Sequence, residues 1–306
     1  MKFNKQTKIA RQGRAAAASA VFVALQFAAV HTAQAQVSAL AQHMAAQTGA
    51  ASMGAAKAVP PNALSALACT APAEFVHFDR PLLHTMRHLN GGQPLIIVAI
   101  GSSSTAGAGA TSPDASYPSR LSVELRTKFP GHEISVLNRG VNGEETDNMM
   151  ARFASDVMAA HPQLVLWQIG TNSVLRDHPL GTHNVELREG IEELKNSGAD
   201  VVLIDPQFAP AVLAKSETPG MVEQIAAAAK EENVDLFRRF AVMRDWHDVQ
   251  HLSFDTFVSP DHLHMNDWSY ACVAKLLGTA IAEAATRPIA AAWVHQNVLS
   301  TNAIVP

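Results

Sequence analysis

The chain has 306 residues, of which 48% are hydrophobic and 16% are charged, a composition that supports one catalytic-size domain with a full apolar core. Its formal net charge of -4 leaves no basic excess for sequence-independent binding to nucleic acid phosphates. We therefore expect its partners to be small molecules or neutral polymers, and not nucleic acids.

The first 35 residues have the pattern of a secretory signal peptide. Five lysines and arginines precede an apolar run at 15–30, and Ala33-Gln34-Ala35 supplies a small-residue cleavage site. The run is shorter than the ~20 residues of a spanning helix, so an uncleaved membrane anchor is the weaker alternative. The mature protein is expected to begin at Gln36 and to be secreted or periplasmic, without a stable membrane anchor.

Residues 36–74 are rich in Ala, Gln, Ser and Gly, and Pro60-Pro61 interrupts them. This composition predicts a low-complexity lead-in or linker. The folded domain is expected over residues 75–290, followed by a C-terminal tail at 291–306.

Cys69 and Cys272 are the only cysteines of the chain. Both follow the predicted signal peptide, and export permits a disulfide bond between them. Such a bond would tether the start of the folded domain to its last helix. The alternative is two buried, unpaired cysteines.

From about residue 75, short apolar runs alternate with longer amphipathic segments, which is typical of a parallel sheet covered by helices. The expected strands are 95–100, 134–137, 164–169, 201–204 and 234–240. The expected helices are 117–129, 145–160, 184–196, 218–232 and 267–285. The strand runs lack polar alternation, as in strands buried on both faces. The pattern predicts an α/β fold, a flavodoxin-like three-layer α/β/α sandwich with a five-stranded parallel sheet.

Active sites in such sheets collect at the carboxyl ends of the strands, and small polar residues and glycines follow the first three runs. The segments are G-S-S-S-T at 101–105, N-R-G-V-N-G at 138–143 and G-T-N at 170–172, with D-H-L-H at 261–264 before the last helix. Each segment alone is a weak signal. Together they offer a hydroxyl, two donors and a base.

The residue types fit acyl transfer. A hydroxyl nucleophile needs a base within hydrogen-bond reach, and the base needs a partner that fixes its tautomer. The spacing of Asp261 and His264 can place both side chains on one side of a helical turn. Donors are also needed for the developing oxyanion: Gly143 leaves its N–H unobstructed, and Asn172 carries a side-chain amide.

In this order the four segments resemble the motifs of the SGNH hydrolases, the lipase and esterase superfamily also called GDSL. The first corresponds to G-D-S-x-T-x-G and makes Ser103 the nucleophile among three adjacent serines. The others correspond to N-x-G-x-x-G, G-x-N and D-x-x-H. The resemblance implies a catalytic triad of Ser103, His264 and Asp261. It also implies an oxyanion hole formed by the N–H groups of Ser103 and Gly143 and by the amide of Asn172.

The resemblance implies a secreted serine esterase that needs no metal or cofactor and hydrolyses carboxylic esters through an acyl-enzyme. Short acyl groups, such as acetyl groups on a carbohydrate, are the expected substrates. Two alternatives remain open on the sequence: an O-acyltransferase acting on an extracellular glycan, and a non-catalytic glycan-binding relative.

Two positions depart from the usual motifs. Ser102 replaces the Asp that commonly precedes the nucleophile, and Ser173 replaces the Asp that often follows the third motif's Asn. Neither change removes a triad or oxyanion group. His262 and His264 lie two residues apart, but no third ligand cluster accompanies them, so a zinc site is not expected. Ser112 breaks the only G-x-G-x-x-G pattern, which excludes that dinucleotide motif.

Overall fold

The computed structural model describes residues 68–288. The predicted signal peptide, residues 36–67 of the predicted lead-in and the predicted tail lie outside these residues. Within them, no helix combines the length and the apolar character needed to cross a bilayer.

Five parallel strands form a single sheet in the order β2-β1-β3-β4-β5. The strands are β1 (Leu95–Gly101), β2 (Ile134–Gly140), β3 (Leu164–Gln168), β4 (Asp200–Ile204) and β5 (Asp235–Phe237). The prediction of a five-stranded, flavodoxin-like α/β fold is confirmed. The chain changes direction across the sheet between β1 and β3, and ligands of such sheets bind at this switch point, beyond the carboxyl ends of the strands.

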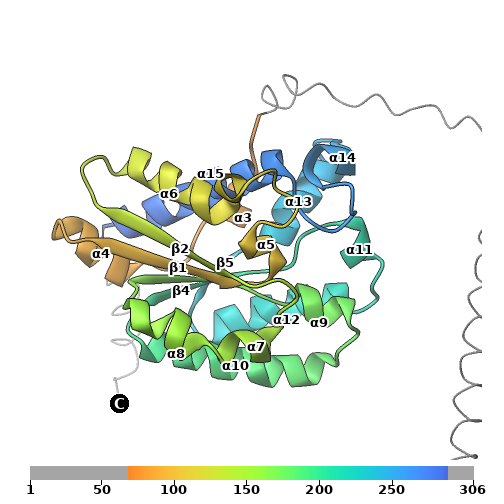
Figure 1. The fold of residues 1–306 in the computed structure, drawn as a ribbon, viewed down its shortest axis with the longest axis horizontal. Coiled ribbons are helices and arrows are strands. Elements are labelled where there is room, and N and C mark those ends of the chain that lie inside the picture. Colours follow the sequence, from red (N-terminus) through yellow and green to blue (C-terminus); the bar gives the residue numbers. More distant parts are fainter. Residues whose placement is uncertain (1–67, 289–306) are drawn as a thin grey trace, which may run out of the picture. The chain divides into compact units, whose positions relative to one another are not determined.

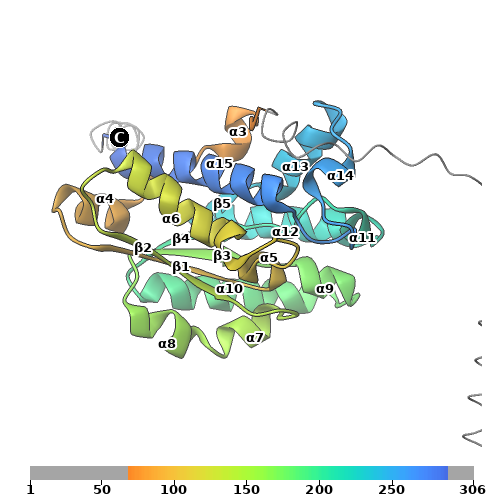
Figure 2. The same cartoon turned by 45° about the horizontal axis from the view of Figure 1, so that its top comes forward.

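Helices cover both faces of the sheet (Figure 1). One face carries α3 (Ala73–Val76), α4 (Leu83–Asn90), α6 (Tyr117–Lys128), α13 (Arg239–Asp248) and α15 (Asp267–Thr286). The other carries α7 (Thr146–Met150), α8 (Phe153–Asp156), α10 (Leu180–Asn196) and α12 (Thr218–Glu231). Figure 2 shows α6 and α15 side by side on one side of the sheet and α7, α8 and α10 on the other.

The strands β1, β3 and β4 are buried on both faces because both faces are covered, whereas the edge strand β2 has exposed residues. Ile97 and Val98 are adjacent in β1 and are both fully buried, but they belong to separate core clusters on opposite faces of the sheet. A strand in this position has no solvent side, so its sequence shows no alternation. This explains the continuous apolar runs from which the strands were predicted.

The segment predicted as one helix at 145–160 forms three short helices, α7, α8 and η2 (Met158–Ala160). α7 ends at Met150, and Arg152 is the non-helical N-cap residue of α8. The Arg152 guanidinium donates to the Glu144 carboxylate at 2.7 Å and to the carbonyl of Arg139 at 2.7 Å. These bonds are tertiary, and the helical period of the sequence does not reveal them.

The strand predicted at 234–240 is also shorter than expected. β5 ends at Phe237, and α13 begins at Arg239. The N–H of Phe240, in the first turn of α13, donates to the buried Asp205 carboxylate at 2.8 Å. This distant acceptor favours the helix over the β-rich local composition.

Residues 68–74, part of the predicted lead-in, lie against the domain. Trp246 Nε1 donates to the carbonyl oxygen of Thr70 at 3.0 Å. Next to it, Cys69 and Cys272 of α15 form a disulfide whose Cα atoms are 5.4 Å apart. The bond ties the first described residues to the last helix.

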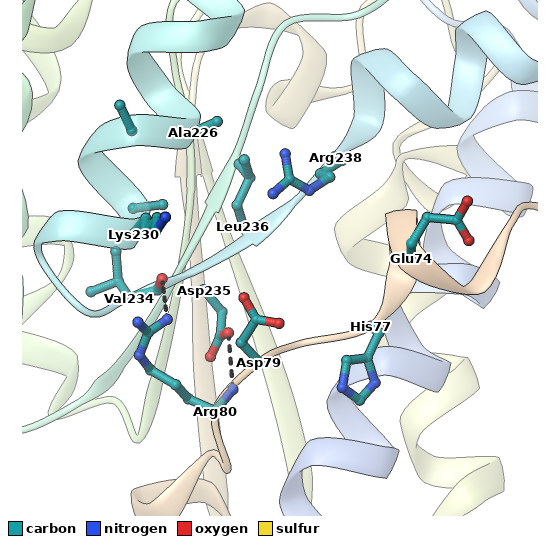
Figure 3. Close-up of a pocket in the computed structure, with 12 residues that line it drawn as sticks. Glu74, His77, Asp79, Arg80, Ala226, Lys230, Val234, Asp235, Leu236 and Arg238 are labelled. Atoms are coloured by element: carbon teal, nitrogen blue, oxygen red, sulfur yellow. Dashed lines mark hydrogen bonds between the residues drawn. The ribbon is translucent and has the colours of Figure 1, made fainter. Parts of the chain in front are cut away.

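Asp235, the first residue of β5, is buried beside Arg80, whose backbone N–H donates to Asp235 Oδ1 at 3.3 Å (Figure 3). Burial raises the pKa of Asp235 to about 6, although the hydrogen bond from the Arg80 N–H and the Arg80 charge oppose the shift. The pocket in Figure 3 lies around these two residues, and none of the four motifs contributes to its lining.

This shift predicts a pH-dependent loss of stability. Because the pKa of Asp235 is higher in the folded state than its ordinary value near 4, ionisation of this one group lowers the stability of the folded state as the pH rises from about 4 through about 6, by up to ~3 kcal/mol. Asp235→Asn keeps an acceptor but does not ionise. We expect the free energy of unfolding of Asp235→Asn, relative to the parent, to rise by about 2–3 kcal/mol between pH 4 and pH 7.5 in urea titrations. A difference that stays constant across this range would contradict the expectation.

Candidate active site

The four predicted motifs meet at the carboxyl end of the sheet. Ser103 is the first residue of α5 (Ser103–Ala106), directly after β1, and Asn172 lies in α9 (Thr171–Leu175), directly after β3. These are the strands that flank the switch point. Gly143 follows β2, and the Val141 N–H donates to the Gly101 carbonyl at 3.0 Å, so the loop after β2 stays against the end of β1.

Ser103, His264 and Asp261 form a continuous hydrogen-bonded chain. His264 Nε2 lies 2.8 Å from Ser103 Oγ. On the other side of the ring, His264 Nδ1 lies 2.6 Å from Asp261 Oδ2. An ionised carboxylate can only accept, so Nδ1 carries the proton and Nε2 is left to accept from the Ser103 hydroxyl.

The prediction that Asp261 and His264 share one side of a helical turn is wrong. Residues 261–264 form a non-helical turn, in which His262 has a φ of 61°. Asp261 Oδ1 accepts the backbone N–H groups of Leu263 and His264, each at 2.9 Å. The carboxylate organises its own turn in this way, as Asp side chains commonly do, and its second oxygen remains for the imidazole.

Elements on both sides hold this turn. Val258 and Met265 pair as an antiparallel bridge across its base. Immediately after it, the Asn266 side chain accepts the Ser269 N–H at 3.2 Å and caps α15. His264 therefore lies between a two-residue bridge and the start of a long, buried helix, which limits its movement.

The environment of Asp261 keeps it ionised. Partial burial alone would raise its pKa, but hydrogen bonds from the His264 side chain, from Ser259 Oγ at 2.7 Å and from the N–H groups of His264 and Leu263 outweigh that effect. The pKa of Asp261 is held well below the usual carboxyl range. A negative charge thus faces His264 wherever the pH is near neutral.

The three predicted oxyanion donors lie on segments that follow the adjacent strands β1, β2 and β3. Within residues 68–288, the backbone N–H groups of Ser103 and Gly143 donate to no protein acceptor. Asn172 Nδ2 gives one hydrogen to the Glu144 carbonyl at 2.7 Å, and no acceptor within the described part of the chain takes its second hydrogen. The same bond fixes the loop that carries Gly143, and Arg176 also donates to the Gly143 carbonyl at 2.7 Å.

The two glycines of the second motif are each required for a different structural reason. Gly143 has a φ of 80°, a left-handed conformation that other residues adopt only with strain. At Gly140, a Cβ atom would collide with the backbone of Ala106 in α5. Gly140 therefore lets the end of β2 approach the helix that begins with Ser103.

Gln168 holds Ser102, which stands where the usual motif has an Asp. It is the buried last residue of β3, and its Oε1 accepts from both the N–H and the hydroxyl of Ser102, each at 3.0 Å. The sequence interpretation missed this residue. A glutamine at the end of an otherwise apolar run was the available signal. Ser259, which bonds Asp261, had no comparable signal.

Other predicted features lie outside this cluster. His262 is exposed and makes no hydrogen bond through its side chain to residues 68–288. No group of three or more His, Cys, Asp or Glu side chains in that range is arranged to hold a metal ion. Ser173, the second departure from the motifs, is buried in α9.

Comparisons with known proteins agree with this architecture. An arylesterase from Vibrio mimicus is 33% identical over 95 residues, which are 31% of this chain and 46% of that protein. The match thus spans less than half of that relative. A two-domain esterase active on acetylated mannans has a similar fold, with a TM-score of 0.59, 18% identity and coverage of 70% of this chain and 56% of that one. A catalytic mutant of an acetylxylan esterase from Geobacillus stearothermophilus gives a TM-score of 0.51 at 18% identity, over 63% of this chain and 95% of that one.

The family comparison covers the whole described domain. Residues 68–287 match the non-GDSL lipase-like family, which is well over half of the chain. The fold and the family support the resemblance that the four motifs suggested. The chain belongs to the non-GDSL lipase-like family.

Proposed function

We propose that the protein is a serine esterase in which Ser103 is the nucleophile, His264 the general base and Asp261 the residue that orients it. The observation that carries the proposal is the chain of 2.8 Å and 2.6 Å contacts from Ser103 through His264 to Asp261. A hydroxyl is a weak nucleophile unless a base accepts its proton as it attacks. The contact between Ser103 Oγ and His264 Nε2 provides this base.

The reaction follows from the positions of the protons. Ser103 Oγ attacks the ester carbonyl carbon while its proton passes to His264 Nε2, and Asp261 stabilises the imidazolium through Nδ1–H. The tetrahedral oxyanion accepts from the Ser103 and Gly143 N–H groups and the Asn172 amide. His264 then returns the proton to the leaving alcohol, which gives an acyl-enzyme. Water then attacks this ester as His264 takes its proton, and His264 returns that proton to Ser103 Oγ as the acid is released.

We propose that the substrates are short-chain acyl esters of glycans, and that the protein is exported to reach them. Two proteins with similar folds are described as esterases of acetylated mannans and of acetylxylan, and this supports an acetylated polysaccharide. The signal-like first 35 residues support secretion or a periplasmic location.

The first test is hydrolysis of 4-nitrophenyl acetate, butyrate and octanoate by the purified mature protein. We expect turnover that is fastest with acetate and unchanged by EDTA. Sugar acceptors added to the assay separate hydrolysis from acyl transfer, because a transferase would form an acyl sugar in place of free acid. Absence of turnover with all three esters would contradict the proposal.

The oxyanion assignment predicts the effect of Asn172→Ala. Loss of one donor to the oxyanion is expected to lower kcat by about 10²- to 10³-fold with little change in KM, because the bond strengthens only as charge develops. Asn184→Ala is the matched control: Asn184 lies in α10, and among residues 68–288 its side chain hydrogen-bonds only Arg188. An unchanged kcat in Asn172→Ala would remove Asn172 from the oxyanion hole.

A further inference from the structure

Gln207 lies at the carboxyl end of the sheet, as the candidate triad does, but it belongs to none of the four motifs. It follows β4 after the short segment Asp205-Pro206, and its side chain is 1% exposed. A buried side-chain amide is costly unless its donors and acceptor are satisfied. The partners of Gln207 therefore explain its presence.

Each polar atom of Gln207 contacts a neighbour of a proposed active-site residue. Gln207 Oε1 accepts from Thr171 Oγ1 at 3.0 Å and lies 3.4 Å from Ser104 Oγ. Gln207 Nε2 donates to the Leu263 carbonyl at 3.2 Å. Thr171 precedes Asn172, Ser104 follows Ser103, and Leu263 precedes His264. One side chain thus connects the segments of the nucleophile, an oxyanion donor and the general base.

A buried arginine sets the orientation of this amide. Arg239 is fully buried; its Nη2 donates to Gln207 Oε1 at 3.1 Å, and its Nε donates to the Asp205 carbonyl at 2.9 Å. Turning the amide over would point its NH₂ group at three donors and its oxygen at the Leu263 carbonyl. In the observed orientation the amide oxygen meets Arg239 Nη2, which can only donate, and the amide nitrogen meets the Leu263 carbonyl, which can only accept.

From these contacts we propose that Gln207 is a positioning residue, which holds the Ser103, Asn172 and His264 segments at their working separations. The inference rests on the proposed esterase function. The three segments come from distant parts of the chain, and a displacement of about 1 Å between reacting groups can cost on the order of 10²-fold in rate. Gln207 touches none of the reacting groups, so its loss should affect kcat and leave KM nearly unchanged.

Gln207→Met tests this, because methionine has a similar length but offers neither the donor nor the acceptor. We expect kcat for 4-nitrophenyl acetate, and the rate at which a fluorophosphonate labels Ser103, to fall at least ~10-fold while KM stays within about twofold. Gln163→Met is the matched control. Like Gln207, Gln163 bonds through both ends of its amide, in this case to the Ile96 N–H and the His161 carbonyl at the opposite end of β3. Its kcat should stay within about twofold of the parent.

Stability is measured alongside, by thermal unfolding of each variant. If kcat is unchanged in Gln207→Met, or falls equally in Gln163→Met, Gln207 has only a structural role and the proposal is wrong. If Gln207→Met does not fold, the variant Thr171→Val tests the proposal instead. It removes one hydrogen bond to Gln207 and should lower kcat several-fold. An unchanged kcat in this variant would overturn the proposal. A parent enzyme without esterase activity would overturn the proposed function together with this inference, whereas an active parent isolates the role of Gln207.

Discussion

Ser103→Ala is expected to reduce kcat/KM for 4-nitrophenyl acetate by about 10⁴-fold or more, to a level near that of the oxyanion donors alone. The reason is geometric: Ser103 Oγ is the hydroxyl at 2.8 Å from His264 Nε2. The adjacent serines cannot replace it, because Ser102 Oγ donates to Gln168 and Ser104 Oγ to Gln207, and both side chains are buried. Steady-state kinetics with the mature protein gives the ratio directly.

The neighbouring serine supplies the control for this variant. Ser104→Ala loses only a 3.4 Å hydrogen bond and should lose far less of its kcat/KM than Ser103→Ala. Equal rates for the parent and Ser103→Ala would show that another residue is the nucleophile. Thermal unfolding of both variants excludes loss of folding as the cause.

Loss of the disulfide is the largest expected change in stability. Cys69 and Cys272 are separated by 203 residues, and in the chain-entropy model a cross-link over a loop of this length stabilises the fold by roughly 5 kcal/mol. The double variant Cys69→Ala/Cys272→Ala should unfold at a much lower urea concentration than the oxidised parent, with a free energy of unfolding lower by about 3–5 kcal/mol.

Reduction with dithiothreitol provides the matching measurement. It should lower the stability of the parent to about that of the double variant and leave the double variant unchanged. An unfolding midpoint of the parent that does not respond to reductant would mean that the two cysteines are not bonded in solution.

The sheet was predictable because a strand buried on both faces has a continuous apolar sequence. Strands such as 95–100 and 164–169 read as continuous apolar runs, and their order in the chain, with helices between them, restricts the topology to a doubly wound sheet. The positions of Ser103 and Asn172 followed from the strands that precede them. The second and fourth motifs depended on recognising a pattern of four spaced segments.

The remaining features depend on contacts between distant residues. Gln207 and Gln168 are single glutamines near strand ends, and only the folded chain shows that their partners adjoin the candidate site. The helix predicted at 145–160 breaks at Arg152 because its guanidinium bonds the carbonyl groups of Gly101 and Arg139, at the ends of β1 and β2. The turn at Asp261 is non-helical because its carboxylate accepts backbone N–H groups. At Arg152 and at Asp261 the hydrogen bonds of one side chain determine the local backbone conformation. The periodicity of the sequence does not indicate such bonds.

The most direct test of the central claim is to locate the nucleophile chemically. The purified protein is treated with a fluorophosphonate, digested and analysed by peptide mass spectrometry, with His264→Ala treated in parallel. The proposal predicts one phosphonyl group, attached to Ser103, and labelling of His264→Ala that is slower by orders of magnitude because the base is missing. Labelling of a different residue, or ester hydrolysis that continues in a protein fully labelled at Ser103, would contradict it.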